Sequence, residues 1–379
     1  MARALVNGRV LAGGEWVEGR AVLIDGGRIA AIVGEANVPA GADRVDLNGG
    51  SLVPGFIDTQ VNGGGDVLFN DEPNVAGIAA IGAAHRRFGT TGFLPTLISD
   101  DLEVMSAAID AVDAAIDAGV PGVLGVHLEG PFLNLERKGI HSAEKIRTLN
   151  PEAMAILTRP GRGKRMVTLA PETVAPEDIR RLADAGIILS AGHTQADCAT
   201  VRRALDHGLR GFTHLFNAMS PLTTREPGTV GAALYDDKSW CGIIVDGFHV
   251  DPLVLQLALR AAPLRRFMLV TDAMPSVGGT KKEFTLNGEV IQARDGKCVS
   301  ASGTIAGSDL DMATAVRNCI ELLGLSLEQT SMLASANPAA FLGLDGELGS
   351  IAPGQRADLV LLDDGLRVVE SWIGGEPAG

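Results

Sequence analysis

The sequence predicts a closed (β/α)8 barrel that carries a small β domain built from both ends of the chain. Through the middle of the chain, eight short apolar runs alternate with Ala-rich helical stretches. Both ends instead contain short strand-like segments separated by Gly-rich turns. Strands that alternate with helices form a parallel sheet, and eight such units close a barrel. An open doubly wound sheet is the alternative, but no Gly-rich phosphate loop follows the first run.

The eight apolar runs have the length of single strands, and the stretches between them are amphipathic and often end at Gly, as helices do. The expected helices include 75–89, 106–119, 176–186 and 198–208. In chain order, the expected strands are 51–58, 91–97, 122–129, 165–172, 186–193, 211–217, 241–249 and 266–272. Parallel barrel strands end at one mouth, where barrel enzymes place their active sites.

The two chain ends are expected to form one small β-sandwich domain from residues 1–53 and 344–379. Neither end alone has enough apolar surface for a stable sheet, whereas together they have. Two separate appendages are the alternative. The barrel is then expected to span 54–343, with a hairpin inserted at about 281–300 after the last strand.

Composition restricts the class of protein. The 379 residues carry a net charge of −14, whereas nucleic-acid and membrane-surface binders need a positive field, so neither partner is expected. Only 4% of residues are aromatic, so the core must be aliphatic. The four cysteines form no CxxC pair, and the sequence shows neither a secretory signal nor a membrane span. We therefore expect a cytoplasmic protein with reduced thiols.

Polar residues gather at the ends of the expected strands. Glu129, His193 and His214 supply one carboxylate and two imidazoles, a common set for a catalytic divalent metal that leaves one position open for water. Asp272 ends the last strand and is the candidate base. The other polar residues at strand ends are His127, Asn217, Asp246 and His249.

Two further histidines, His127 and His85, are not assigned to the metal site. His127 shares a strand face with Glu129, so it either supports the metal ligands from behind or only packs in the core. His85 lies in a helical pattern beside basic residues, which predicts a surface position.

Several motifs occur in order along nearly the whole chain: PGFIDTQVNGGG, HLEGPFLN, KGIH, SAGHT, THLFNAM, DGFHV, LVTDAM and SGTIAGS. Together they resemble the N-acetylglucosamine-6-phosphate deacetylases of the amidohydrolase superfamily. This resemblance implies the same ligand set, with Asp272 as catalytic acid/base and His141 helping to hold and polarise the acetamide carbonyl.

The resemblance also implies the substrate site. Asn217, Ala218 and Arg225 match the positions that bind the sugar phosphate, and Arg225 is expected to act in the partner subunit of a homodimer. His249 matches a further substrate contact, and we group Asp246 with it. The remaining positions implied to line the sugar and acetyl site are Ile140, Ile305, Ala306 and Gly307.

One departure concerns the number of metal ions. Many amidohydrolases have HxH at the end of the first strand and bind two metals, whereas this chain has Gln60 and Asn62 there. Neutral amides are poor ligands for such metals. We therefore expect one divalent metal per subunit, with zinc favoured over iron, manganese or cobalt, and Gln60 and Asn62 join His127 as candidates to support the site.

The expected reaction is hydrolysis of N-acetylglucosamine 6-phosphate to glucosamine 6-phosphate and acetate, in amino-sugar catabolism and cell-wall sugar recycling. Two alternatives remain: another barrel hydrolase, such as a cyclic-amide hydrolase or aminopurine deaminase, and a barrel scaffold without catalysis. The first alternative usually needs HxH, and the second typically loses metal ligands.

Overall fold

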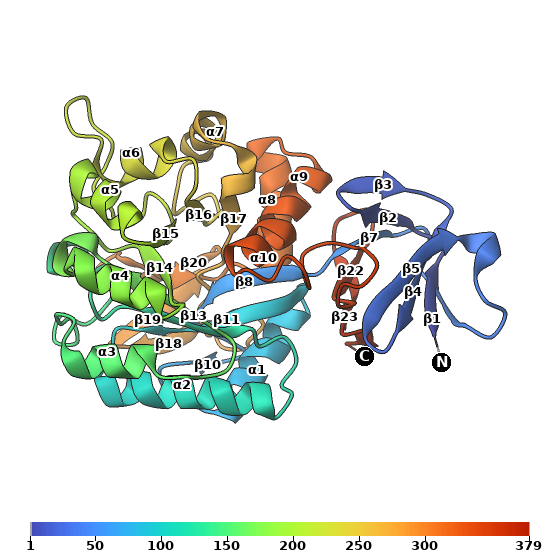
Figure 1. Cartoon of the computed structure of the whole chain (residues 1–379), viewed down its shortest axis with the longest axis horizontal. Helices are drawn as coiled ribbons and strands as arrows, with labels where there is room; N and C mark the ends of the chain where they lie inside the picture. Colours follow the sequence, from blue (N-terminus) through green and yellow to red (C-terminus); the bar gives the residue numbers. More distant parts are fainter. Residues whose placement is uncertain (1, 379) are drawn as a thin grey trace.

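An eight-stranded parallel barrel occupies the middle of the chain in the computed structural model, which describes residues 2–378 (Figure 1). Neighbouring strands follow one another in sequence, and the last strand returns to the first through a parallel bridge between Val61 and Ala273. The predicted (β/α)8 barrel is confirmed. Its strands are β8 (Phe56–Val61), β11 (Thr90–Ile98), β12 (Gly125–Glu129), β13 (Lys164–Leu169), β14 (Ile188–Ala191), β15 (Leu209–Phe212), β16 (Trp240–Ile243) and β17 (Phe267–Leu269).

Helices surround the barrel and bury their apolar faces against its strands (Figure 1). Side chains of Asn74, Asn150 and Asp197 cap α1, α3 and α5 by accepting backbone N–H groups. The α-helices are α1 (Val75–Arg86), α2 (Leu102–Asp117), α3 (Pro151–Thr158), α4 (Pro176–Asp184), α5 (Cys198–Asp206), α6 (Gly228–Tyr235), α7 (Pro252–Ala261), α8 (Met312–Leu323), α9 (Leu327–Ser331) and α10 (Asn337–Phe341). Short elements are the π-helix η5 (Met332–Ala336), the 3₁₀ helices η1 (Glu35–Asn37), η2 (Leu135–Arg137), η3 (Pro171–Thr173) and η4 (Leu264–Arg266), and strands β9 (Gly63–Gly64) and β10 (Val67–Leu68).

The first expected strand, 51–58, is in fact two strands. The chain leaves β7 (Ser51–Pro54), which belongs to the small β domain, and enters the barrel at β8. Gly55 sits at the switch, where a Cβ atom would approach Oγ1 of Thr91 to 2.0 Å. The absence of a side chain therefore allows the domain crossing to be this tight.

The small β domain contains segments from both ends of the chain. One sheet has the order β5-β4-β1-β6, and the other has the order β24-β23-β22-β7-β2-β3, in which β22 pairs antiparallel with β7. Leu5, Val22, Leu359 and Trp372 meet in its buried core. The remaining bounds are β1 (Arg3–Val6), β2 (Arg9–Ala12), β3 (Glu15–Val17), β4 (Arg20–Asp25), β5 (Arg28–Gly34), β6 (Asp43–Asp46), β22 (Leu359–Leu362), β23 (Val368–Ile373) and β24 (Glu376–Pro377).

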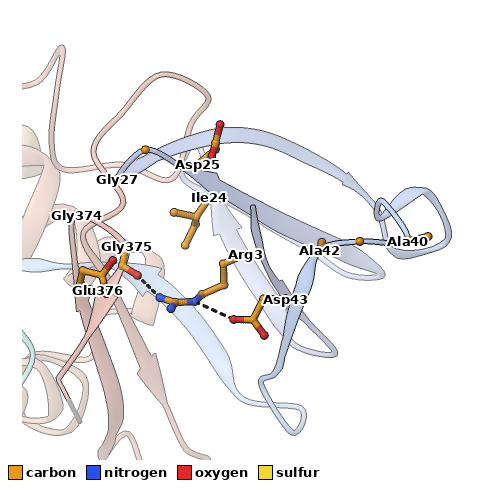
Figure 2. A pocket seen from close by; sticks show the side chains of 12 residues that line it. Arg3, Ile24, Asp25, Gly27, Ala40, Ala42, Asp43, Gly374, Gly375 and Glu376 are labelled. Atoms are coloured by element: carbon orange, nitrogen blue, oxygen red, sulfur yellow. Dashed lines mark hydrogen bonds and ion pairs between the residues drawn. The ribbon is translucent and has the colours of Figure 1, made fainter. Parts of the chain in front are cut away.

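A side-chain bridge ties the two chain ends together. The guanidinium of Arg3 donates to the carbonyl of Gly375, and its Nε lies 3.6 Å from Oδ2 of Asp43 (Figure 2). A hollow of about 500 Å³ lies beside this bridge. It holds no group of metal-binding side chains; within residues 2–378, the one such group is in the barrel.

The insertion after the last barrel strand is larger than the expected hairpin at 281–300. It is a four-stranded antiparallel sheet, because residues 283–300 form three strands and the SGTIAGS segment supplies a fourth. Asn287 in its first turn donates to the carbonyl oxygen of Ile140 at 2.9 Å, which ties the insertion to the loop after β12. The strands are β18 (Glu283–Leu286), β19 (Glu289–Arg294), β20 (Lys297–Ser300) and β21 (Ile305–Ser308).

Two smaller expectations have different outcomes. The four cysteines are free thiols, and Cys241, Cys298 and Cys319 are buried. The expected surface position of His85 is wrong: its side chain is fully buried, and Nε2 contacts the carbonyl oxygen of Gly63 at 2.9 Å. In the described part of the chain, no helix combines the length and apolar character of a membrane span.

Candidate metal-dependent active site

The C-terminal ends of the barrel strands bring together the side chains that the sequence predicts to hold a metal. Glu129 ends β12, while His193 and His214 follow β14 and β15, and all three are buried. Nε2 of His214 lies 2.9 Å from Oε1 of Glu129, and Nε2 of His193 lies 3.2 Å from the same oxygen. One possible ligand atom from each residue lies within 4.8 Å of the others. The three side chains therefore share a single point.

The protonation pattern at this point suits a cation. Nδ1 of His193 lies 2.8 Å from the carbonyl oxygen of Arg137, which only accepts, so Nδ1 carries the proton. In neutral His193, Nε2 then directs a lone pair at the Glu129 carboxylate, and it lies 3.1 Å from Nε2 of His214. The Nε2 lone pair of His193 and the Glu129 oxygen repel each other unless a positive charge lies between them. Two imidazoles and one carboxylate therefore fit a divalent transition-metal ion.

The Glu129 carboxylate is suited to bind such an ion. Burial opposes its ionisation, but the close contacts with the His193 and His214 imidazoles hold its pKa well below the usual range. The residue is therefore anionic at neutral pH.

Backbone strain accompanies the cluster. His193, His214 and Asp272 have φ values of 48°, 34° and 54°, and Ala218 has 49°. Residues other than Gly rarely adopt this left-handed region, and each such residue costs about 1–3 kcal/mol. The strands end in these turns, which direct the functional side chains into the mouth of the barrel.

Asp272 faces the metal cluster from the last strand. It is 8% exposed and lines the same cavity as Glu129, His193 and His214. Burial and then the Glu129 charge raise the pKa of Asp272 to about 6. A carboxyl group with a pKa near neutrality can both accept and return a proton, as an acid/base must.

His141 has a defined tautomer. The backbone N–H of Ser99 donates to Nδ1 of His141 at 3.2 Å, so Nδ1 is unprotonated. Burial and the neighbouring His193 lower the pKa of His141 to about 3, so the ring is neutral and its proton is on Nε2. His141 therefore offers an N–H donor beside the cavity, as stabilisation of a carbonyl oxygen requires.

Asp246 and His249 form a pair at the cavity edge. Nδ1 of His249 donates to Oδ2 of Asp246 at 2.6 Å, and the backbone N–H of His249 donates to Oδ1. Burial opposes ionisation of Asp246, but the bond from His249 lowers its pKa. His249 lines the cavity, whereas Asp246 lies behind it and fixes its orientation.

The cavity has a volume of about 200 Å³. Among the other predicted substrate contacts, Ala306 is buried beside the cavity without lining it, and Arg225 is exposed in the loop 221–227. Ile98, Gly139 and Met274 line the cavity but were not predicted, since they lack reactive groups. The predicted residues that line it are Asn62, Glu129, Ile140, His141, His193, His214, Asn217, Ala218, His249, Asp272, Ile305 and Gly307.

A polar layer lies under the cluster in the barrel interior. His127 contacts Oγ1 of Thr168 at 2.8 Å and Oγ1 of Thr96 at 3.2 Å. Burial lowers the pKa of His127 to about 4, so the ring is neutral. His127 is therefore part of the barrel interior and makes no hydrogen bond to Glu129 among the described residues.

Glu172 positions the loop that carries His193, and the sequence reasoning missed it. Its carboxylate accepts hydrogen bonds from the side chains of Thr194 and Asn134, at 2.5 and 2.9 Å, and from the backbone of Gln195 at 2.6 Å. The position of Glu172 at the end of the fourth apolar run was the available signal.

Comparisons with known proteins agree with this geometry. Residues 51–379 match the amidohydrolase family, and residues 3–52 match the NagA composite domain. An N-acetylgalactosamine-6-phosphate deacetylase from a Shewanella species is 45% identical over 97% of this chain and 94% of its own length. An N-acetylglucosamine-6-phosphate deacetylase from Haemophilus influenzae is 32% identical over 99% of both chains.

Solved structures give the same result. N-acetylglucosamine-6-phosphate deacetylase from Pasteurella multocida has a TM-score of 0.96 at 34% identity and matches 100% of this chain and 99% of its own. An aspartate-to-alanine mutant of the Mycobacterium smegmatis enzyme, in complex with N-acetyl-D-glucosamine-6-phosphate, has a TM-score of 0.91 at 33% identity, with 100% and 99% covered. This chain belongs to the amidohydrolase family, in the group of the N-acetylglucosamine- and N-acetylgalactosamine-6-phosphate deacetylases.

Proposed function

We propose that this enzyme hydrolyses N-acetylglucosamine 6-phosphate to glucosamine 6-phosphate and acetate. The observation that carries the proposal is the meeting of Glu129, His193 and His214 at one point in a cavity that Asp272 and His141 also line. Relatives with this activity match nearly the whole chain. This supports hydrolytic deacetylation over cyclic-amide hydrolysis, deamination or a scaffold role, and we propose that the enzyme acts in amino-sugar catabolism and cell-wall sugar recycling.

The side chains have distinct roles in the proposed reaction. Glu129, His193 and His214 would hold one divalent metal ion, with zinc as the favoured metal. When bound, such an ion polarises the scissile carbonyl and lowers the pKa of the attacking water. Asp272 accepts the proton that this water loses and later donates it to the leaving nitrogen, which would otherwise be a poor leaving group. His141 donates its Nε2 proton in a hydrogen bond to the carbonyl oxygen as negative charge develops there.

The 4-epimer is a second candidate substrate, because the Shewanella relative, at 45% identity, is named for N-acetylgalactosamine 6-phosphate. The two sugars differ only in the direction of one hydroxyl group, far from the acetamide carbonyl. We expect acetate release from N-acetylglucosamine 6-phosphate, and comparison of kcat/KM for the two 6-phosphates decides the preference. If neither sugar 6-phosphate releases acetate, the proposed function is contradicted. A higher kcat/KM for the 4-epimer would change only the identity of the preferred substrate.

We also propose a homodimer of cytoplasmic location. Leu253 and Leu257 lie one turn apart on α7 and are 60% and 54% exposed, and Leu222 is 59% exposed in the loop 221–227. Apolar surface of this kind is typical of a protein interface. The same loop carries Arg225 outside its own cavity, which supports a role in a partner's site.

We propose that the residues 1–53 and 344–379 fold as one domain and 54–343 as the other.

Arg225→Ala should chiefly impair the use of phosphorylated sugar. A guanidinium binds phosphate through two parallel hydrogen bonds, which alanine cannot replace. We expect kcat/KM for N-acetylglucosamine 6-phosphate to fall by at least about tenfold, as the loss of a charge-assisted bond implies. The activity on unphosphorylated N-acetylglucosamine should hardly change. Arg210→Ala, an exposed arginine on β15, serves as the matched control. Equal losses on both sugars would argue against a phosphate contact.

A further inference from the structure

Two buried amides from the first barrel strand surround Asp272. Gln60 lies in β8, and Asn62 is the first residue after this strand. Their side chains are buried, with 1% and 0% exposed. Because side chains alternate along a strand, residues two apart share a face, and here both extend toward the acid/base.

Both amide nitrogens contact the same oxygen of Asp272. Nδ2 of Asn62 lies 2.6 Å from Oδ1, and Nε2 of Gln60 lies 3.2 Å from it. Nε2 of Gln60 also lies 3.1 Å from Oε1 of Glu129. An amide nitrogen has two N–H donors and no acceptor, so Gln60 donates one hydrogen bond to each carboxylate.

The other oxygen of Asp272 is free. Within residues 2–378, Oδ2 accepts no hydrogen bond, although Asp272 lines the cavity. We propose that Gln60 and Asn62 are positioning residues that occupy Oδ1 of Asp272 and so reserve Oδ2 for proton transfer. The inference rests on the proposed deacetylase function.

The proton balance is as follows. An O–H bond of the attacking water breaks as an O–H bond forms at Oδ2, and the remaining hydroxide oxygen bonds to the carbonyl carbon while the C=O π pair moves onto the carbonyl oxygen, to re-form when the leaving group departs. The C–N bond then breaks while the proton on Oδ2 moves to the leaving nitrogen, which departs as an amine. Oδ1 takes no part in either step, because its lone pairs accept N–H donors throughout.

A second observation points to the reacting groups. Oδ1 of Asn62 is buried and has no hydrogen-bond partner among the described residues, while Asn62 lines the cavity. Unpaired buried acceptors are rare and costly in native proteins. A donor that arrives with the substrate or the water would satisfy this oxygen, so the amide of Asn62 faces both Asp272 and the reaction.

Gln60 and Asn62 should therefore have separable effects. Among the described residues, the side chain of Asn62 donates only to the acid/base, whereas that of Gln60 also donates to Glu129, which would bind the metal. The titratable groups whose charges act on the pKa of Asp272 are Glu129, His214, His249 and Asp58.

The test compares Asn62→Ala and Gln60→Ala with Asn337→Ala. The control amide is also buried, but it donates to the carbonyl oxygens of Leu264 and Phe267 at the opposite end of the barrel. In Asn62→Ala, we expect kcat to fall by about tenfold to a hundredfold, as for other supporting hydrogen bonds, with KM and Zn²⁺ affinity retained. The acid limb of kcat should move to higher pH, because the bond from Asn62 favours the ionised Asp272.

Gln60→Ala should lower kcat and also weaken Zn²⁺ binding by about tenfold, measured by competition with a chelator in the absence of substrate. Asn337→Ala should lower the melting temperature without changing the pH limb or Zn²⁺ affinity. If Asn62→Ala does not fold, Asn62→Leu keeps the branched shape without the hydrogen-bonding atoms and should give the same kcat result.

Unchanged kcat in both Asn62 variants would overturn the inference, as would the same pattern in Asn337→Ala. A wild-type enzyme that releases no acetate would instead contradict the proposed function. Zn²⁺ affinity still tests the inference in that case, because equal affinities of the wild type and Gln60→Ala overturn it.

Discussion

Asp272→Asn is expected to lower kcat by roughly 10²–10⁴, the range that general acid/base catalysis contributes. Asparagine has nearly the same shape as aspartate, but its amide can neither take the proton of the attacking water nor return one to the leaving nitrogen. Steady-state acetate release from N-acetylglucosamine 6-phosphate measures the effect. Metal content should stay at the wild-type value, because Glu129, His193 and His214 meet without Asp272.

The pH dependence of the wild type gives an independent check. A general base works only when deprotonated, so kcat should fall as the pH drops through the pKa of Asp272. Burial and Glu129 raise this pKa to about 6, and a bound cation would lower it again, so the acid limb should lie below pH 6. Near-normal turnover of Asp272→Asn would show that another group carries the proton.

Removal of metal should abolish activity while leaving the fold intact. The three proposed ligands lie at the mouth of a barrel whose large apolar core does not depend on them, so the metal-free protein should keep its circular dichroism spectrum. Its melting temperature should be lower, because an ion that binds only the folded state stabilises that state by mass action. We expect acetate release to fall by several orders of magnitude after dialysis against a chelator.

Reloading should need one equivalent of Zn²⁺ per chain. The first-strand positions are the amides Gln60 and Asn62, whose nitrogens face the Asp272 carboxylate, and neutral amide oxygens are poor ligands for a second transition-metal ion. Glu129→Gln is the matched variant: it should reload poorly, because a neutral amide replaces the anionic ligand. Two firmly bound ions per chain, or full activity without metal, would contradict this part of the proposal.

The sequence was most informative where local pattern and barrel geometry coincide. Strand length and the alternation of strands with helices predicted all eight barrel strands, and the residues at strand ends predicted which side chains would meet. Glu129, His193 and His214 are far apart in the chain, but the ends of parallel strands always meet at one mouth.

Other features had no local signal. Gly55 divides one apolar run between two domains, because only Gly fits against Thr91 there. His85 is buried although its helix has basic neighbours, since its partner Gly63 comes from another element. The inserted sheet is larger than a hairpin, because residues 283–300 form three strands and a fourth lies in a segment that also reads as a loop.

The sequence by itself therefore determined the barrel and the small β domain, because strand period is a local property of the chain, and it supplied the candidate site residues through strand ends and through motifs that resemble the deacetylase family. Only the tertiary structure decided the chemical state of those residues: the Nε2–H tautomer of His141 comes from Ser99, and the free oxygen of Asp272 comes from Gln60 and Asn62. The physical reason is that a tautomer or a proton position depends on hydrogen-bond partners that folding brings from distant parts of the chain.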